Sequence, residues 1–241
     1  SYDPAYAYEI RHIVRDALER WYGPDSGRNR DMMYYLTVYN EPMVQPAEPE
    51  NVDVEGILGG IYKVADAPAG QGPQVSLLAS GVGVPWVLQA REMLLEHWGV
   101  RASVYSVTSW NQLRRNALEV DEHNFLHPEQ PAQVPFLSQK LAGATGPFIA
   151  TSDYDHLVPD QIRQWIPGDY HVLGADGFGF SDTRAAARRF FKIDAASVVT
   201  KALEALAKQG QVDRSLVGQA IDRYDLLNVR AGNSGAQGGD A

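Results

Sequence analysis

Residues 74–109 read QVSLLASGVGVPWVLQAREMLLEHWGVRASVYSVTS, and this stretch decides the class of fold. The run from Gln74 to Ser80 is apolar and bounded by turn residues, which predicts a buried strand. A helix is expected from Pro85 to His97, ended at Gly99, and a second strand from Ala102 to Thr108. Two strands joined by a helix form the unit from which parallel sheets are built.

The same alternation of strands and helices continues to the C-terminal part of the chain. The further expected elements are a polar helix from Gln112 to about Val120, strands at Pro147 to Ser152 and Tyr170 to Gly174, and helices near Pro159 to Trp165, at Thr183 to Phe191, at Ala195 to Lys208 and at Arg214 to Tyr224. Residues 72–229 therefore predict an α/β domain of three layers with a mainly parallel sheet. Residues 230–241 lack periodicity and are expected to form a disordered tail.

The N-terminal part has a different character. A helix is expected from Tyr6 to Tyr22, after Asp3 as cap and Pro4, with Val14 and Leu18 on its apolar face. Residues 32–39 are continuously apolar and predict a buried strand. Residues 42–71 begin with prolines and acidic residues and are expected to be a linker. One helix and one strand bury too little for a core, so we expect residues 1–41 to be the end of another domain, and residues 1–55 to be poorly packed alone.

The composition excludes several classes of function. A formal net charge of −9 argues against non-specific nucleic-acid binding, and the absence of cysteine excludes disulfides and thiolate chemistry. No run of about 18 apolar residues is present, so no membrane span is expected. The chain starts with Ser1 rather than Met and shows no signal pattern, so we expect it to be a piece of a longer cytoplasmic protein.

The turn Ser80-Gly81-Val82-Gly83 lies between a strand and a helix, where glycines and a helix N-terminus can hold phosphate. The third glycine of the dinucleotide fingerprint is absent, and position 86 is Trp. A tight turn is therefore the preferred interpretation.

Two groups of residues have side chains suited to metal binding or acid–base chemistry. Asp153-Tyr154-Asp155-His156 follows a strand, but no further ligand stands at a convincing spacing, so a helix-capping loop is preferred. His123 and His127 fit anchors of a loop better than general bases, and no Ser-His-Asp set stands out. No catalytic, cofactor-binding or metal-binding residue is assigned to this chain.

The segment from Gly174 to Asp182 is unusual for its three glycines and for Phe178 and Phe180. Asp182 can cap the helix that starts at Thr183, and the two rings can be buried anchors. A shaped turn and a subunit interface are both open interpretations, and they are compatible with each other.

Several stretches, in this order, resemble the C-terminal third of homodimeric pyruvate dehydrogenases. They are Tyr2 to Glu9, Tyr35 to Pro42, Gly59 to Tyr62, Val104 to Trp110, Leu126 to Pro128 and Leu173 to Arg184. The wider transketolase family is resembled by Leu77 to Gly81, Asp176 to Ser181 and Ile193 to Val199. No single motif is decisive, but their order and spacing over the chain up to about Val229 are specific.

The resemblance implies a subunit that binds thiamine diphosphate and Mg²⁺ between its upstream domains, decarboxylates pyruvate and transfers the acetyl unit to a lipoyl group. The elements that bind the cofactor and activate it lie upstream in that family and have no matching position here. Residues 1–41 then correspond to the last helix and strand of the pyrimidine-binding domain, and residues 72–229 to the transketolase C-terminal-like domain. The expected partners are the upstream domains, a second subunit and the lipoyl acyltransferase.

Two alternatives remain open. The chain could be a separately encoded interaction module without catalysis, or it could belong to an enzyme that uses another 2-oxo acid or a ketose donor. The choice of pyruvate depends on the resemblance, because none of these residues selects a substrate on chemical grounds.

Overall fold

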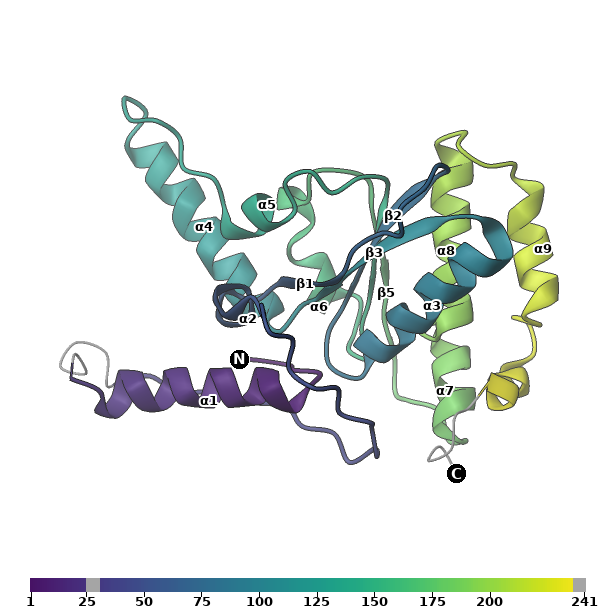
Figure 1. The fold of residues 1–241 in the computed structure, drawn as a ribbon, viewed down its shortest axis with the longest axis horizontal. Coiled ribbons are helices and arrows are strands. Elements are labelled where there is room, and N and C mark those ends of the chain that lie inside the picture. The colour runs from purple at the N-terminus through teal and green to yellow at the C-terminus, as the bar shows by residue number, and fades with distance from the viewer. Residues whose placement is uncertain (25–30, 236–241) are drawn as a thin grey trace.

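The computed structural model describes residues 1–24 and 31–235, and its centre is a five-stranded sheet (Figure 1). The strands lie in the order β1-β3-β2-β4-β5, with β1 antiparallel to β3 and the other neighbours parallel. They are β1 (Tyr62–Ala65), β2 (Gln74–Ala79), β3 (Arg101–Ser106), β4 (Phe148–Thr151) and β5 (Tyr170–Leu173). The expected mainly parallel α/β sheet is confirmed, and the antiparallel edge strand β1 is an addition to it.

Helices cover both faces of this sheet and give three layers. The α-helices are α1 (Ala7–Tyr22), α2 (Val54–Gly59), α3 (Gly83–Trp98), α4 (Trp110–Leu126), α5 (Phe136–Lys140), α6 (Leu157–Asp160), α7 (Arg184–Phe191), α8 (Ala195–Lys208) and α9 (Ser215–Arg223). The 3-10 helices are η2 (Arg163–Trp165) and η3 (Val229–Gly235). None of the helices in the described ranges is long and apolar enough to cross a membrane.

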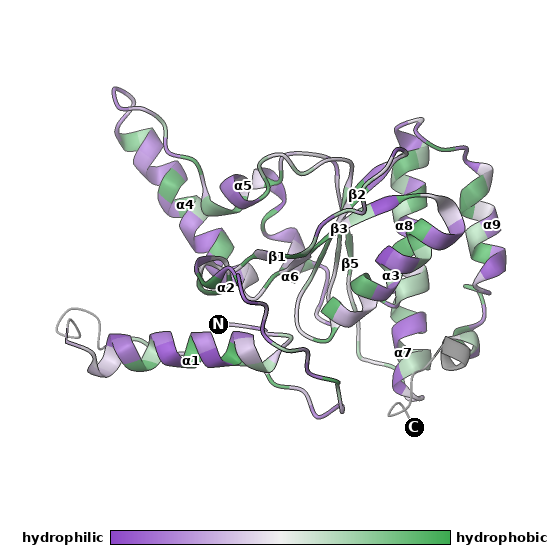
Figure 2. Ribbon diagram, in the orientation of Figure 1, coloured by the Kyte–Doolittle hydropathy of each residue, from purple (hydrophilic) through white to green (hydrophobic). Residues whose placement is uncertain are grey.

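Successive side chains of the central strand β2 point to opposite faces, as the period of two requires. Leu77 packs in the cluster that contains α3 and α8, whereas Leu78 packs in the cluster that contains α4 and α5. Figure 2 shows apolar residues on the strands and on α8, with polar residues more frequent along α1 and α4. Both faces of the sheet are thus cores, which explains the continuous apolar runs.

The first residues of the chain belong to the core of this domain. Tyr2, Tyr6, Tyr8 and Ile13 are buried in the same apolar cluster as α3 and α8. The expectation that residues 1–55 are poorly packed is therefore wrong for residues 2–13. The outer side of α1 differs, because Val14 and Leu18 are 38% and 50% exposed.

The expected buried strand over residues 32–39 is also wrong. This segment is extended, but among the described residues it forms only one isolated bridge, between Tyr2 and Leu36. Tyr34 is half-buried beside α1, where its hydroxyl donates to Asp16 Oδ2 at 2.8 Å, whereas Met33 and Val38 are 89% and 73% exposed. An apolar run indicates that a partner surface exists, but it does not say that this part of the chain supplies it.

Four boundaries differ from those expected. The range 42–71 contains α2 and β1, with Ile57 and Ile61 fully buried, so within it only residues 42–53, 60–61 and 66–71 lack helix or strand. Helix α4 is longer than the expected Gln112 to Val120, and α6 and η2 replace one helix at Pro159 to Trp165. In the expected tail, η3 packs against α7, where a Cβ on Gly232 would lie 2.5 Å from the Ala185 carbonyl oxygen. Residues 236–241 lie outside the described residues.

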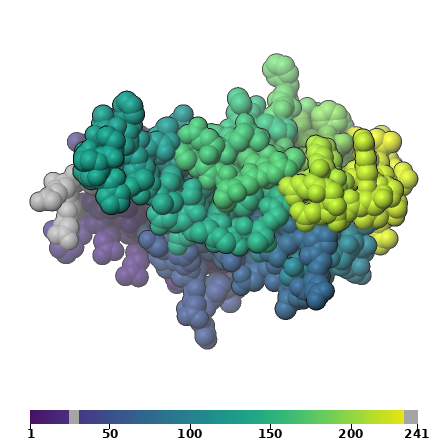
Figure 3. Space-filling view, turned by 90° about the horizontal axis from the view of Figure 1, so that it is seen from above, coloured from purple at the N-terminus to yellow at the C-terminus, as the bar shows by residue number. Residues whose placement is uncertain are grey.

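The molecule is elongated, and its two ends are formed by different helices. Seen from above in Figure 3, the region of α4 and the C-terminal helices α8 and α9 occupy opposite ends, with the sheet region between them. The carboxyl ends of the parallel strands lie in the middle, where the N-terminal residues cross them.

Candidate functional site

The carboxyl ends of β2 and β4 mark the point at which ligands bind in many open α/β sheets. Strand β3 lies on one side of β2, and β4 lies on the other. The chain therefore leaves the carboxyl ends of β2 and β4 in opposite directions along the sheet, and these ends form a topological switch point. The Ser80–Gly83 turn follows β2, and the Asp153–His156 loop follows β4. The structure thus brings together two of the motifs that the sequence pointed to.

The Ser80–Gly83 turn does not offer a free anion site. The Gly81 N–H donates to the Asp3 carbonyl at 3.0 Å, the Gly83 N–H to Ser80 O and the Val84 N–H to Gly81 O. Gly81 has φ +50°, and a Cβ there would meet the Tyr39 hydroxyl at 2.2 Å. The space beside the turn is therefore filled by the N-terminal segment, and the tight turn is what the structure shows.

The acidic loop after β4 caps helix α6 and contacts Asp176 in the glycine-rich segment. Asp155 Oδ1 accepts the Leu157 N–H at 2.7 Å and caps α6. His156 donates its backbone N–H to Asp176 Oδ1 at 3.0 Å, and its Nδ1 lies 2.9 Å from the same oxygen. Hydrogen bonds from His156 lower the pKa of Asp176 below its ordinary value. Within residues 1–24 and 31–235, no three His, Asp or Glu side chains are placed to hold a metal ion.

Asp153 is the member of this loop whose environment is most perturbed. Burial raises the pKa of Asp153 to about 6, and the nearby charge of Asp3 acts in the same direction. Asp3 is 6% exposed, and its Oδ1 accepts hydrogen bonds of 2.5 Å from the hydroxyls of both Thr37 and Tyr39. This cluster was not found from the sequence. A weak signal was present, because Thr37 and Tyr39 share one face of an extended segment.

His123 and His127 lie away from the strand ends, in the last turn of α4 and at its C-terminal cap. Their rings stack with centroids 4.5 Å apart, and His127 Nδ1 lies 2.9 Å from the His123 carbonyl oxygen. His123 is helical rather than in a loop, and His127 anchors the helix end.

The segment from Gly174 to Asp182 is an irregular surface loop whose two phenylalanines differ. Phe180 stacks on Phe190 of α7, with centroids 4.4 Å apart and planes at 8°. Phe178 is fully exposed and Phe180 is 37% exposed, so the expectation of two buried anchors is wrong for both rings in the isolated chain. Thr183, rather than Asp182, caps α7 through the Ala186 N–H at 3.2 Å.

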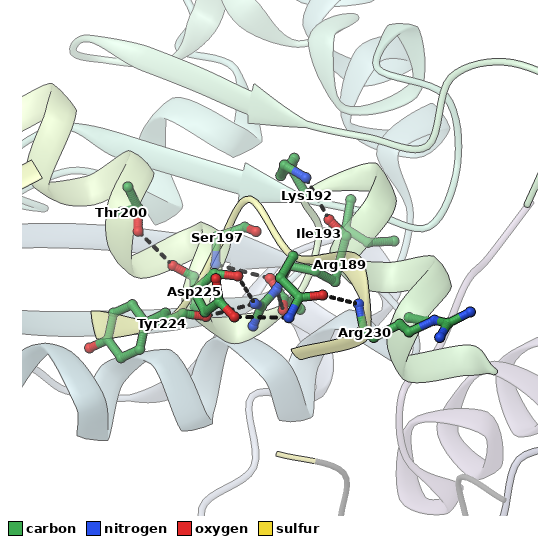
Figure 4. A network of polar contacts seen from close by, with 12 residues as sticks. Arg189, Lys192, Ile193, Ser197, Thr200, Tyr224, Asp225 and Arg230 are labelled. Atoms are coloured by element: carbon green, nitrogen blue, oxygen red, sulfur yellow. Dashed lines mark hydrogen bonds and ion pairs between the residues drawn. The ribbon is translucent and has the colours of Figure 1, made fainter. Parts of the chain in front are cut away.

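A groove with a volume of about 850 Å³ separates α3, the 41–46 segment and the C-terminal turn. On one side Arg188 pairs with Glu41 and lies 4.6 Å over the ring of Trp86. On the other side the buried Arg189 donates from Nε to Asp194 Oδ2 at 2.6 Å and from Nη1 to the Tyr224 carbonyl at 2.8 Å (Figure 4). These arginines are held by acids and carbonyls of the same chain, so the groove wall is built by structural ion pairs.

Comparison with known proteins agrees with this architecture. Residues 60–194 match the family described as the transketolase-like TK C-terminal domain, and the chain belongs to that family. The chain is 49% identical over 231 residues to the pyruvate dehydrogenase E1 component of Mycolicibacterium smegmatis, covering 96% of this chain and 24% of that protein. It is 42% identical over 227 residues to the E1 component of Escherichia coli, covering 94% of this chain and 25% of that protein.

Solved structures support the fold at lower identity. A transketolase from Pichia stipitis superposes with a TM-score of 0.54 and 16% identity, covering 86% of this chain and 25% of that one. A split-gene transketolase, described as an inactive tetramer of four beta subunits, has a TM-score of 0.50 and 18% identity, covering 86% of this chain and 56% of that one. The chain spans about a quarter of the length of the curated relatives.

Proposed function

We propose that this chain is the C-terminal part of a cytoplasmic pyruvate dehydrogenase of the homodimeric type. The complete enzyme decarboxylates pyruvate with thiamine diphosphate and transfers the acetyl unit to lipoyl groups of the acyltransferase. The observation that carries this proposal is the similarity at 49% identity over nearly the whole chain to a protein named as an E1 component.

We propose that this part supports assembly and is inactive alone. The residues do not fit a cofactor site, because the N–H groups of Gly81 and Gly83 are occupied and Tyr39 fills the adjacent space. The described residues also lack a group of acids and histidines suited to Mg²⁺. Thiamine diphosphate and the metal would then bind upstream of this segment.

The exposed apolar residues at the N-terminal end suit contacts with the missing domains. Leu18, Tyr22, Met33, Tyr35 and Val38 are all half or more exposed on α1 and the extended segment. We propose that residues 1–41 complete the pyrimidine-binding domain, that the 42–71 range connects to the domain at 72–229, and that Phe178 lies at the contact with a second subunit. Large exposed apolar side chains of this kind are typical of surfaces that are covered in an assembly.

Two measurements on the isolated chain and on a chimera test the proposal. Calorimetric titration of the 241-residue chain with thiamine diphosphate and Mg²⁺ should give no binding heat. A chimera in which this chain replaces the last quarter of the M. smegmatis E1 component should restore pyruvate decarboxylation that the truncated relative lacks. Micromolar cofactor affinity of the isolated chain, or a chimera as inactive as the truncated control, would contradict the assembly role.

The substrate is tested on the complete enzyme that contains this chain. Pyruvate, a longer 2-oxo acid and a ketose phosphate should be compared at equal concentration, and we expect the highest kcat/KM with pyruvate. Preference for either of the others would select an alternative 2-oxo acid or ketose enzyme. A complete natural product of only this length would instead identify a separate interaction module.

A further inference from the structure

The C-terminal end of α4 and the turn that follows it project from the body of the molecule, and we call residues 118–135 the α4 tip. Figure 1 shows α4 running away from the sheet and from α1, and Figure 3 places the region of α4 at one end of the molecule. Leu118, Phe125, Leu126 and Val134 of the α4 tip are 40%, 81%, 60% and 52% exposed. A group of large apolar side chains on a projecting element is typical of a surface that another molecule covers.

Three of these side chains lie on one face of the helix. Phe125 and Leu126 follow Leu118 by seven and eight positions, which is the spacing of residues on one face of an α-helix. With a rise of about 1.5 Å per residue, this exposed face is about 12 Å long. Its length matches slightly more than two turns of a second helix.

The turn after α4 is fastened to the helix end. Asn124 Oδ1 accepts the Gln133 N–H at 2.8 Å, and Asn124 Nδ2 donates to the Gln133 carbonyl at 2.9 Å. The His127 ring stacks on that of His123, and the His127 N–H donates to the His123 carbonyl at 3.0 Å. Val134 follows Gln133 directly, so it is held beside the helix end. A surface that already has a fixed shape loses less conformational entropy when it binds.

The charge of the α4 tip selects the chemistry of its partner. The tip contains no lysine or arginine and four exposed acids, which are Glu119, Asp121, Glu122 and Glu129. Arg115, one turn before the tip, lies 3.8 Å from the Glu119 carboxylate, and a pair of such exposed side chains contributes little. These acids repel a second α4 tip, an anionic membrane surface and nucleic acid, and they attract a basic protein surface.

We propose that the α4 tip docks a basic amphipathic helix of a protein outside the enzyme dimer. Apolar side chains of that helix, three and four positions apart, pack on Leu118, Phe125 and Leu126, and the lysines or arginines beside them face the acids of the tip. Because α4 runs away from α1, where the upstream domains are proposed to join, the tip stays open in the complete enzyme. This docking goes beyond the proposed function, which it uses only for the positions of the upstream domains and the second subunit.

A synthetic peptide of about four helical turns, with leucine at the a and d positions and lysine elsewhere, is the probe. Calorimetric titration of the 241-residue chain with this leucine–lysine peptide should give a Kd in the micromolar range. A scrambled peptide of the same composition keeps the charge but has no apolar face, so it should bind about tenfold more weakly. Raising the salt from about 0.05 M to about 0.15 M should weaken binding of both peptides.

Two double variants of the α4 tip separate its apolar and charged contacts. Phe125→Ala/Leu126→Ala should weaken binding of the leucine–lysine peptide about tenfold and keep the salt dependence. Glu119→Gln/Glu122→Gln should weaken binding and reduce the salt dependence. Both variants should melt as the wild type does, because the four side chains are exposed.

Matched controls change the same residue types elsewhere on the chain. Leu18→Ala/Met33→Ala truncates two exposed apolar side chains near the N-terminus, and Glu50→Gln/Glu96→Gln removes two exposed charges outside the tip. Both control variants should bind the leucine–lysine peptide with the affinity of the wild type.

A thiol at position 130 reports whether the α4 tip is open in the complete enzyme. The chain has no cysteine, so Gln130→Cys gives the chain a single thiol at an exposed position of the tip. Its reaction with a maleimide, followed by mass spectrometry of the fragment that contains residue 130, should be equally fast in the 241-residue chain and in the complete enzyme. The leucine–lysine peptide should slow the reaction in both.

Three results would overturn the proposal. The first is equal affinity for the ordered and the scrambled peptide, because charge alone would then account for binding. The second is unchanged affinity in Phe125→Ala/Leu126→Ala. The third is maleimide labelling at least about tenfold slower in the complete enzyme than in the 241-residue chain, because the upstream domains or the second subunit would then cover the α4 tip.

Discussion

The Glu9 carboxylate, on the first turn of α1, accepts a 2.6 Å hydrogen bond from the Tyr62 hydroxyl, which comes from β1 on the edge of the sheet. Glu9 is fully buried and also accepts from the Ser106 hydroxyl at 2.8 Å and from the Tyr6 N–H at 2.9 Å. Burial raises the pKa of Glu9, and these hydrogen bonds oppose that effect. One side chain thus caps a helix and ties it to two strands of the sheet.

Replacing Glu9 should destabilise the whole domain. In Glu9→Ala the hydroxyls of Tyr62 and Ser106 and the N–H of Tyr6 lose their acceptor, and we expect a loss of about 3 kcal/mol. Glu9→Gln keeps one acceptor oxygen and should lose about half as much. Urea unfolding measures both, and an alanine variant within about 0.5 kcal/mol of wild type would show that water replaces these contacts.

Deleting residues 1–55 should unfold or strongly weaken the remaining domain. The deletion removes Tyr6, Tyr8 and Ile13 from the core, and burial of each such side chain contributes about 1.5–3 kcal/mol. This outcome is the reverse of what the acidic linker suggested from the sequence. The measurement is the cooperativity of thermal unfolding of residues 56–235, with deletion of residues 236–241 as the control; a sharp transition at the original temperature would contradict it.

Arg189 should be needed for the C-terminal turn. Arg189 is 5% exposed, and its guanidinium donates to the Asp194 carboxylate and to the carbonyls of Tyr224 and Asp225. Because Asp225 has φ +47°, a strained value for a residue other than glycine, the turn depends on such contacts. Arg189→Ala should cost about 3–5 kcal/mol, since it leaves Asp194 without its buried partner.

Controls for Arg189 are available on the same chain. Arg189→Lys keeps the charge but cannot bridge the acid and the two carbonyls, so most of the loss should persist. Arg114→Ala changes an exposed arginine of α4 and should have little effect. Guanidinium unfolding of the three variants measures their free energies of unfolding. Equal stability of Arg189→Ala and Arg114→Ala would contradict a structural role for Arg189.

The two phenylalanines of the glycine-rich loop should act differently in the complete enzyme. Phe178→Ala should weaken self-association about tenfold while leaving the melting of the isolated chain unchanged, because the ring touches little within one chain. Phe180→Ala loses its stacking on Phe190 and should cost about 1 kcal/mol of stability. Both variants should keep the KM for pyruvate.

Sedimentation of the complete enzyme measures the dimer constant, and Phe125→Ala, which truncates an 81% exposed ring at the end of α4, is the matched control. A Phe178→Ala enzyme that remains dimeric but binds pyruvate ten times more weakly would place the loop at the active site.

The sequence by itself determined the α/β class and most of the parallel sheet. The runs at 74–79, 101–106, 148–151 and 170–173 alternate with helical segments that have clear stops, and this alternation predicts a mainly parallel sheet. Strand β1 was missed because it follows a helix of only six residues, too short for its periodicity to be read, inside a range that was interpreted as a linker.

The tertiary structure alone decided which apolar and acidic residues face each other. The apolar composition of residues 32–39 predicts a buried strand, yet their neighbours in this chain cover only one side. An apolar run predicts that a segment is covered, but it does not predict which chain or domain covers it. Glu9 lies 53 positions from Tyr62 and 97 from Ser106, and Asp3 lies 34 positions from Thr37 and 36 from Tyr39. No local pattern couples positions so far apart; they meet because the packed sheet brings its carboxyl edge and its edge strand under the first residues of the chain, and burial there sets the charge states.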